Sequence, residues 1–463
     1  MKKYSIHSIL IVILLFFFFG SCFGNGDVSR DKFINDIEYY TNVINEAHAE
    51  PYRMISKHRF EKKVEELKYH VRSLKSDKIP INDCYFFLQE LTALIQDGHT
   101  RINFPFQNLE DSDLLLPFEL KVIDEKVFII KKLEENQVPL FSEILKINHT
   151  PIRTLMLESY KLFNSSLKHG KWSLFEFSFQ LFLPTYFDLP SPWIVTYKSD
   201  SQIREAEVKG IAVSQYLATF QIDTQYRESS FIVDGEVIPI LDIPSFAHGN
   251  EREYRNFIDT FFEKHKKANY LVIDLRKNLG GNGTWGYYLM DYLTDSPYRI
   301  IESFDFKVSD IFRDSQYSNK AGDKLKEAKN GTYLPIDTVE IRSPHRKASK
   351  FRGSVFLLTS QYTFSAGVVM AAIFKFNKMG TVIGQETFGK EKFCSDPIKL
   401  KLPHTKLEVS FPLAIYTLPG NNPDRGVIPD ILTVHSIEDY QNHKDKELDK
   451  VRELIKEKST RRK

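Results

Sequence analysis

The sequence predicts an α/β protein of several domains, and two patterns support this. Residues 31–97 carry apolar side chains at three- and four-residue steps, which is the spacing of amphipathic helices. Further along, short apolar runs at 238–243 and 270–275 flank an amphipathic segment at 251–267, the strand–helix–strand order of an α/β core. A chain of 463 residues, 42% of them hydrophobic, is long enough for two or three domains.

The N-terminus has the features of a secretory signal. Lys2 and Lys3 precede an unbroken apolar run at residues 9–19, which is too short to cross a bilayer core about 30 Å thick. Two small residues then lead to Cys22, as in a bacterial lipoprotein whose cysteine is acylated after cleavage. We expect an exported lipoprotein of the cell envelope, periplasmic or attached to the outer membrane, and an uncleaved anchor is the alternative.

Removal of residues 1–21 would leave a chain without net charge. Lys2 and Lys3 are the charged residues of this segment, so the formal charge falls from +2 to 0. A neutral chain offers no field that attracts nucleic acid. Of the remaining cysteines, Cys84 and Cys394, we expect free thiols, because a chain of this length does not need a disulfide for stability.

The helical stretch at 31–97 ends in Asp97-Gly98-His99-Thr100. A histidine in a turn is most often a structural hydrogen-bonding residue. Beyond it, residues 114–208 alternate in the manner of strands, and within them 142–152, SEILKINHTPI, resembles the strand and turn of a PDZ domain, which binds a peptide end as an added strand. A β-rich spacer that binds nothing is the alternative.

The stretch from 355 to 390 has the order strand, serine, helix, strand, lysine. Ser365 stands at the start of a helix-like segment, where unpaired backbone N–H groups favour negative charge. Lys390 follows 25 residues later, after a second strand-like run. This order indicates Ser–Lys acyl-transfer chemistry, although a capping serine and a solvated lysine are the ordinary alternatives.

A pair of glycines follows the apolar run at 270–275. Gly280 and Gly281 allow the backbone to approach a ligand closely and to direct N–H groups at it. Asp274 and Arg276 are expected to hold this loop together rather than to react. Trp285, just past the glycines, is expected in the core, with the wall of a substrate pocket as the alternative.

Together these motifs resemble the S41 family of serine peptidases, the C-terminal processing and tricorn-core-like proteases. The matching pieces, in chain order, are DGHT (97–100), IDLRKNLGG (273–281), LLTSQYTFSAG (357–367), VIGQETFGK (382–390) and RGVIPDI (425–431). The resemblance implies a ClpP/crotonase-like α/β core, polypeptide substrates and no cofactor. It implies Ser365 as nucleophile, Lys390 as general base with His99 as the alternative, and an oxyanion hole formed by Gly280 or Gly281 with the amide of Ala366.

The sequence departs from the family pattern after both catalytic candidates. Gly367 and Val368 replace a common Ser-Glu pair, and Glu391 replaces a glycine, so that a carboxylate adjoins the proposed base. A binding protein that kept the fold without the chemistry is therefore the rival function. No metal-binding or nucleotide-binding motif is found, and the oligomeric state is open.

The expected domain organisation has five parts. They are a signal peptide (1–21), a helical domain (22–105), a PDZ-like module (106–210), the peptidase core (211–440) and a C-terminal helix with a tail (441–463). Within the core, residues 213–243 are expected to be β-rich, and residues 297–350 to form a flap or exposed loop near the site.

Overall fold

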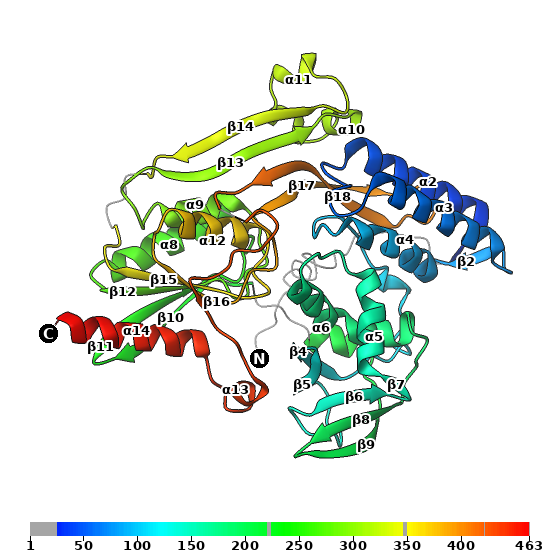
Figure 1. Ribbon diagram of the computed structural model, residues 1–463, viewed down its shortest axis with the longest axis horizontal. Helices are drawn as coiled ribbons and strands as arrows, with labels where there is room; N and C mark the ends of the chain where they lie inside the picture. Colours follow the sequence, from blue (N-terminus) through cyan, green and yellow to red (C-terminus); the bar gives the residue numbers. More distant parts are fainter. Residues whose placement is uncertain (1–25, 220–223, 346–349, 421, 463) are drawn as a thin grey trace. The chain divides into compact units, whose positions relative to one another are not determined.

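The computed structural model describes residues 26–219, 224–345, 350–420 and 422–462, so the predicted signal segment and Cys22 lie outside the described residues. The chain divides into two compact units (Figure 1). The first comprises Met1–Ile222, Phe306–Leu334 and Cys394–Ile415, and the second Asp223–Asp305, Pro335–Phe393 and Tyr416–Lys463. The five-part division expected from the sequence remains a prediction.

The first unit begins with helices, as the periodicity predicts. Their buried stripes recur at three- and four-residue steps, as in Phe33, Ile37, Tyr40 and Ile44 of the first helix. A side-chain cap from Ser56 starts the second helix. The elements are β1 (Asp27–Ser29), α2 (Arg30–Ala47), α3 (Lys57–Ser73), β2 (Lys78–Pro80), α4 (Ile81–Ile95) and β3 (Arg101–Ile102).

A β-rich module follows in the same unit. Its strands form a sheet in the order β4-β5-β6-β8-β9, with β7 paired to β6. The stretch at 142–152, expected as a strand and a turn, contains strand β6, a turn and the short strand β7, which pairs with β6. The elements are β4 (Phe118–Ile123), β5 (Lys126–Lys132), β6 (Glu143–Ile147), β7 (Thr150–Pro151), α5 (Ile152–Ser159), α6 (Lys168–Thr185), β8 (Trp193–Ser199) and β9 (Gln202–Val208).

One edge of this sheet, strand β4, is covered by helix α6. The Glu176 carboxylate accepts a hydrogen bond from the Val122 amide at 2.8 Å, and the Gln180 side chain donates to the Phe118 carbonyl at 2.9 Å. Glu176 also forms an ion pair at 3.2 Å with Lys121, and both residues are buried. These side chains occupy backbone groups that an added strand would need.

The second unit is built on a six-stranded sheet in the order β10-β11-β12-β15-β16-β19. The pairs from β11 to β19 are all parallel, and β10 joins β11 as an antiparallel hairpin. The strands are β10 (Arg227–Val233), β11 (Glu236–Asp242), β12 (Tyr270–Asp274), β15 (Ser354–Thr359), β16 (Thr381–Gly384) and β19 (Ile431–Leu432).

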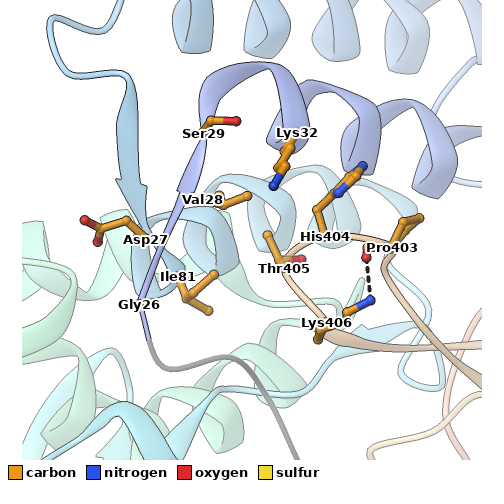
Figure 2. A pocket seen from close by; sticks show the side chains of 10 residues that line it. All are labelled: Gly26, Asp27, Val28, Ser29, Lys32, Ile81, Pro403, His404, Thr405 and Lys406. Carbon is orange, nitrogen blue, oxygen red and sulfur yellow. Dashed lines mark hydrogen bonds between the residues drawn. The ribbon is translucent and has the colours of Figure 1, made fainter.

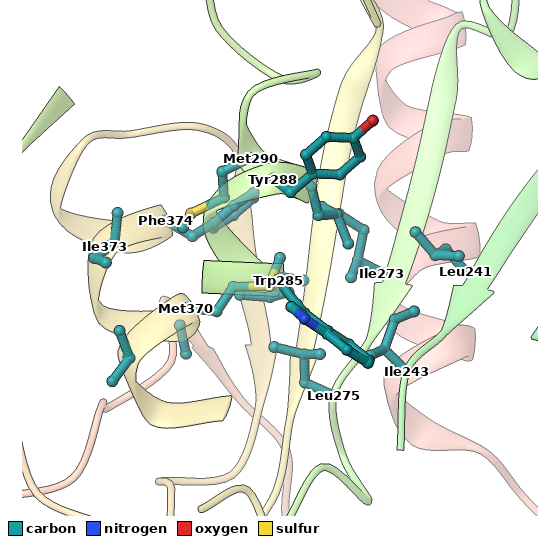
Figure 3. Packing of buried hydrophobic residues seen from close by; sticks show 14 of the residues in the cluster. Leu241, Ile243, Ile273, Leu275, Trp285, Tyr288, Met290, Met370, Ile373 and Phe374 are labelled. Carbon is teal, nitrogen blue, oxygen red and sulfur yellow. The ribbon is translucent and has the colours of Figure 1, made fainter. Parts of the chain in front are cut away.

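Helices cover both faces of this sheet (Figure 1). Alternate residues of β12 belong to hydrophobic clusters on opposite faces of the sheet. Leu271 and Ile273 lie in the first cluster, and Tyr270 and Val272 lie in the second. Figure 3 shows members of the first cluster, which includes Trp285. The helices that contribute to the first cluster are α8 (Glu251–His265), α9 (Gly283–Met290) and α12 (Ala366–Phe376). Helix α14 (Lys446–Arg462) contributes to the second cluster, and the short helix α13 (Ile437–Gln441) precedes it in the chain.

Helix α8 illustrates how local sequence sets these elements. Asn250 caps it, accepting from the Glu253 amide at 3.0 Å, while the Glu253 carboxylate accepts from the Asn250 amide at 3.3 Å. This capping box fixes the first turn, and the buried stripe that includes Ile258 and Phe261 turns towards the sheet.

The prediction of a flap or exposed loop at 297–350 is wrong, because the segment contains two long strands. Alternating apolar residues such as Ile300, Phe304 and Phe306 are buried, which a solvated loop would not allow. The strands belong to a sheet of order β14-β13-β18-β17, with β3 paired to β18, and each of these four contains residues of both units. The elements are β13 (Tyr298–Lys307), α10 (Asp310–Arg313), α11 (Lys324–Glu327), β14 (Tyr333–Arg342), β17 (Lys392–Lys401) and β18 (Glu408–Thr417).

Two smaller expectations also need correction, and one is confirmed. The β-rich portion expected at 213–243 begins with a helix, α7 (Val213–Thr219), whose Val213 and Tyr216 are buried. Residues 459–462, expected to be part of the C-terminal tail, belong to helix α14, because no glycine or proline ends the helix before them. Cys84 and Cys394 are both free and buried, as expected.

Candidate active site

The predicted catalytic serine and the glycine pair lie at the carboxyl ends of neighbouring strands. Strands β12 and β15 pair in parallel, with Asp274 opposite Leu358, so the loops that leave them emerge at the same edge of the sheet. The loop after β12 carries Gly280 and Gly281, and the loop after β15 carries Ser365. The fold therefore brings the two motifs together.

Ser365 has a strained backbone at the start of a helix. It is the N-cap residue of α12, with φ of 50° and ψ of −119°, and its side chain is half-buried. A positive φ costs a residue other than glycine of order 1–3 kcal/mol, so it persists only where the surroundings impose it. Helix α12 is buried from Ala366 to Phe374, which fixes the direction of its N-terminus.

Asn278 ties the glycine loop to the serine loop. Its carbonyl accepts from the Phe364 amide at 2.8 Å, beside Ser365. Its side chain donates to the Ile243 carbonyl at 2.7 Å and accepts from the Gly280 amide at 2.9 Å. Asn278 is fully buried, and no role is predicted for it from the sequence, although it lies inside the motif.

Glycine is required at two positions here by close packing. A Cβ atom on Gly280, where φ is 104°, would lie 2.6 Å from the Ser365 Cβ. A Cβ atom on Gly367 would lie 2.7 Å from the Asn278 Oδ1. The departure at Gly367 from the usual family residue thus makes room for Asn278.

The geometry distinguishes between the two glycines as oxyanion donors. The Gly280 amide already donates to Asn278, whereas the amides of Gly281 and Ala366 donate no hydrogen bond to any other described residue. The same Cβ on Gly280 would lie 3.3 Å from the Ala366 nitrogen, so these backbones are adjacent. Gly281 with Ala366 is therefore the better pair of donors.

The segment that carries Lys390 packs against the serine loop. The Phe388 amide donates to the Thr363 carbonyl at 3.0 Å, and the Phe364 and Phe388 rings meet edge to face at 5.1 Å. A Cβ atom on Gly389 would lie 3.0 Å from Val368. Lys390, the next residue, is half-buried, and its backbone forms an isolated antiparallel β-bridge with Gly426.

The carboxylate of Glu391 is held by a neighbouring loop. Its Oε2 accepts from the Asn422 amide at 3.1 Å, and a Cβ atom on Gly420 would lie 2.1 Å from the same oxygen. Burial raises the pKa of Glu391. A carboxyl group that is less readily ionised opposes a neutral Lys390 less strongly than the sequence alone implies.

His99 belongs to the first unit. Burial, together with the nearby Arg101, lowers the pKa of His99 to about 3, so that its ring is neutral at pH 7. The ring hydrogen-bonds to the Cys394 carbonyl, which leaves the other ring nitrogen as an acceptor. Thr100 and Asp97 fix the turn, their side chains meeting at 2.6 Å.

Trp285 and a pocket in the first unit are the remaining candidate features. Trp285 is 5% exposed and stacks on Tyr254 at 4.6 Å, so it is a core residue. Within the described ranges no group of His, Cys, Asp or Glu side chains could hold a metal ion, and no described helix has the length and apolar character of a membrane span. A pocket of about 350 Å³ in the first unit (Figure 2) is lined by Gly26, Asp27, Val28, Ser29, Lys32, Ile81, Pro403, His404, Thr405 and Lys406.

Comparison with known proteins relates part of the chain to a peptidase family. Residues 238–433, which include Gly280, Ser365 and Lys390, match the model of peptidase family S41. This region of the chain is therefore similar to the peptidases of family S41. Along the chain, 159 residues are 24% identical to a tail-specific protease of Haemophilus influenzae, which is 34% of this chain and 18% of that protein. The chain thus spans less than a fifth of the length of the curated relative it matches.

Solved structures show the same multidomain α/β fold. The structure of a mutant of CPAF has a TM-score of 0.72 at 14% identity and covers 92% of this chain and 97% of its own. Mature CPAF has a TM-score of 0.68 over similar shares, also at 14% identity. A peptidase structure from Parabacteroides merdae has a TM-score of 0.50 at 13% identity, over 92% of this chain and 97% of its own.

Proposed function

We propose that this chain is a serine endopeptidase that hydrolyses polypeptides through an acyl-enzyme on Ser365. The observation that carries the proposal is the backbone of Ser365, a non-glycine residue with φ of 50° between a buried parallel strand and a buried helix. The same strand–turn–helix strain presents the nucleophile in other serine hydrolases. A serine that only capped the helix would not need it.

The reaction follows from the neighbouring groups. Ser365 Oγ attacks the peptide carbonyl carbon while a neutral base takes its proton, and the carbonyl oxygen becomes an oxyanion. The amides of Gly281 and Ala366 donate to that oxyanion, and one such donor is worth about 3 kcal/mol of barrier. The base then gives the proton to the leaving amine. Water, deprotonated by the same base, hydrolyses the ester and frees Ser365.

Lys390 is the proposed base, because its segment packs on both sides of the serine loop through Thr363 and Val368. It must be neutral to act, and a lysine with a reference pKa of about 10.4 is neutral only when its surroundings lower that value. Glu391 next to Lys390 would favour the charged lysine, but Glu391 is bound to the Asn422 amide and its pKa is raised by burial, so this effect is weaker than its position in the sequence implies.

His99 is the alternative base. Its lowered pKa keeps the ring neutral, and its bond to the Cys394 carbonyl fixes one tautomer, so its chemistry suits the role without further adjustment. A base must come within hydrogen-bond reach of the serine hydroxyl during the reaction, and substitution decides between the two candidates.

The test is hydrolysis of an unfolded, fluorescently labelled protein by the wild type and by Ser365→Ala, Lys390→Ala and His99→Ala. We expect Ser365→Ala and Lys390→Ala to be inactive and His99→Ala to keep most of its activity. Activity near wild type in Lys390→Ala, with His99→Ala as inactive as the serine variant, would reverse the base assignment. Equal hydrolysis by the wild type and Ser365→Ala would refute Ser365 as the nucleophile, and no hydrolysis by the wild type would support the rival, a binding protein without the chemistry.

We also propose that the protein is anchored in the cell envelope by a lipid on Cys22, which the sequence features of residues 1–22 support. Fractionation tests this directly. Cys22→Ala should release the protein from the membrane fraction, and a wild-type protein already recovered in the soluble fraction would refute the anchor.

The β-rich module at 118–208 is proposed to contribute a PDZ-like peptide site. Because α6 covers the β4 edge through Glu176 and Gln180, strand addition is expected at the opposite edge, β9. Proline at Glu205, in the middle of β9, should weaken cleavage of tail-tagged proteins while short peptides are cleaved as before. Equal loss on both substrates would indicate a structural spacer.

A further inference from the structure

The side chain of Arg276 links the glycine loop to the C-terminal helix. Arg276 lies just past Leu275, the first residue after strand β12, and precedes Gly280 in the loop. Its guanidinium grips Asp274 through two nitrogens, at 3.0 and 2.7 Å. A third nitrogen donates to Asp445 at 2.8 Å and to Glu447 at 3.0 Å, both at the start of α14.

Glu447 is a buried carboxylate that is fully paired. It is 2% exposed, and besides Arg276 it accepts from Thr433 Oγ1 at 2.5 Å and contacts His435 Nε2 at 2.7 Å. Burial acts to raise the pKa of Glu447, but these hydrogen bonds and the nearby Arg276 outweigh it and lower the pKa to about 2. A buried charge is costly unless it is paired, so any movement that breaks one of these contacts costs free energy. Glu447, Arg276, Thr433 and His435 are therefore held in one geometry.

The carboxylates are fixed to a rigid element. Asp445 Oδ1 also accepts from the Leu448 amide at 3.0 Å, which anchors it to the first turn of α14. The helix packs on the sheet through Val451 and Ile455, both 0–1% exposed. Arg276 is thus held against a helix that cannot shift without disturbing the core.

The backbone at Arg276 is tied to the serine loop. Its carbonyl accepts a hydrogen bond from Ser360 Oγ, and the Leu275 carbonyl accepts from Thr363 Oγ1 at 2.8 Å. A shift of Arg276 therefore moves the glycine loop relative to the loop that ends at Ser365.

We propose that Glu447, with Asp445, is a positioning residue that acts through Arg276 to set the distance between the oxyanion donors and Ser365. This rests on the proposed peptidase function. The C-terminal helix is then a part of the catalytic apparatus, and Arg276 is the residue of the motif that connects them.

The test compares Glu447→Gln with Glu453→Gln, an exposed position on the same helix. Glutamine keeps the size of the side chain and removes one of the three carboxylate charges that hold Arg276. We expect Glu447→Gln to lower kcat about 10- to 100-fold, as small misplacements near reacting atoms do, with KM within about threefold of wild type. Glu453→Gln should match the wild type.

A role in stability alone predicts a different result. The folded fraction of Glu447→Gln would then keep wild-type kcat while its melting temperature falls. Arg276→Lys provides a second variant, because lysine keeps the charge but cannot grip three carboxylates at once. It should show the same loss of kcat, and unchanged kcat in both variants would overturn the proposal.

Amide hydrogen exchange separates this inference from the proposed function. In the Ser365→Ala background, Glu447→Gln should make the hydrogen-bonded amides of residues 278–280 exchange at least about tenfold faster, because local opening becomes easier. Unchanged exchange there refutes the positioning role whatever the activity. Faster exchange supports the coupling of Glu447 to the glycine loop. If the wild type hydrolyses no protein, the peptidase function is refuted, whatever the exchange result.

Discussion

Replacement of Gly280 by alanine is the most specific perturbation of the site. The added Cβ would lie 2.6 Å from the Ser365 Cβ and 3.2 Å from its Oγ. Because carbon atoms in contact are ordinarily about 3.5–4.0 Å apart, the serine or the glycine loop must move by about 1 Å. A displacement of that size costs about 10²-fold in rate.

Alanine at this position also strains the backbone. Gly280 has φ of 104°, a conformation that alanine adopts at a cost of order 1–3 kcal/mol. We therefore expect Gly280→Ala to be less stable by about that amount and to react with a fluorophosphonate about 10²-fold more slowly. The measurements are the labelling rate and the urea midpoint.

Gly283→Ala is the matched control. It lies three residues further on, at the start of α9, and a Cβ atom there meets nothing within 4 Å. This variant should label and unfold like the wild type. A Gly280→Ala variant that labels at the wild-type rate would refute the packing of the glycine loop on Ser365.

Three further predictions concern charge. With Lys390 as base, kcat/KM should fall steadily as the pH drops from 8 to 5, whereas a flat profile to pH 4 would indicate His99, whose pKa of about 3 keeps it neutral throughout. Since the pKa of Glu447 is lowered from 4.5 to about 2, its stabilisation is complete above pH 5 and is lost as the pH falls to 2. Urea midpoints of Glu447→Gln should therefore change less over this range than those of the wild type. Glu176→Ala, which removes the buried carboxylate that forms an ion pair with Lys121, should cost about 3–5 kcal/mol in urea unfolding, against about 0–1 kcal/mol for Glu119→Ala at an exposed pair, and similar costs would contradict the buried pairing.

The local parts of this fold could be predicted from the sequence. Helices such as α2 and α8 place apolar residues at helical spacing and carry their own capping residues, so neighbours in sequence determine them. The long strands β13 and β14 could not be predicted, because the burial of residues such as Phe304 depends on partners distant in sequence.

The candidate site divides in the same way. The family resemblance identified Ser365 and the glycine pair, and the parallel pairing of β12 with β15 brings them together. The roles of Asn278 and Glu447 depend on contacts across long separations, 171 residues in the case of Arg276 and Glu447, and no spacing rule indicates such a partner.

The central claim is that Ser365 is a nucleophile, and covalent labelling tests it most directly. The wild type is treated with a fluorophosphonate, its intact mass is measured, and the adduct is located by digestion and fragmentation. The account predicts one adduct per chain, on Ser365, and none in Ser365→Ala. An adduct on another residue, or no adduct in a preparation that hydrolyses protein, would contradict it.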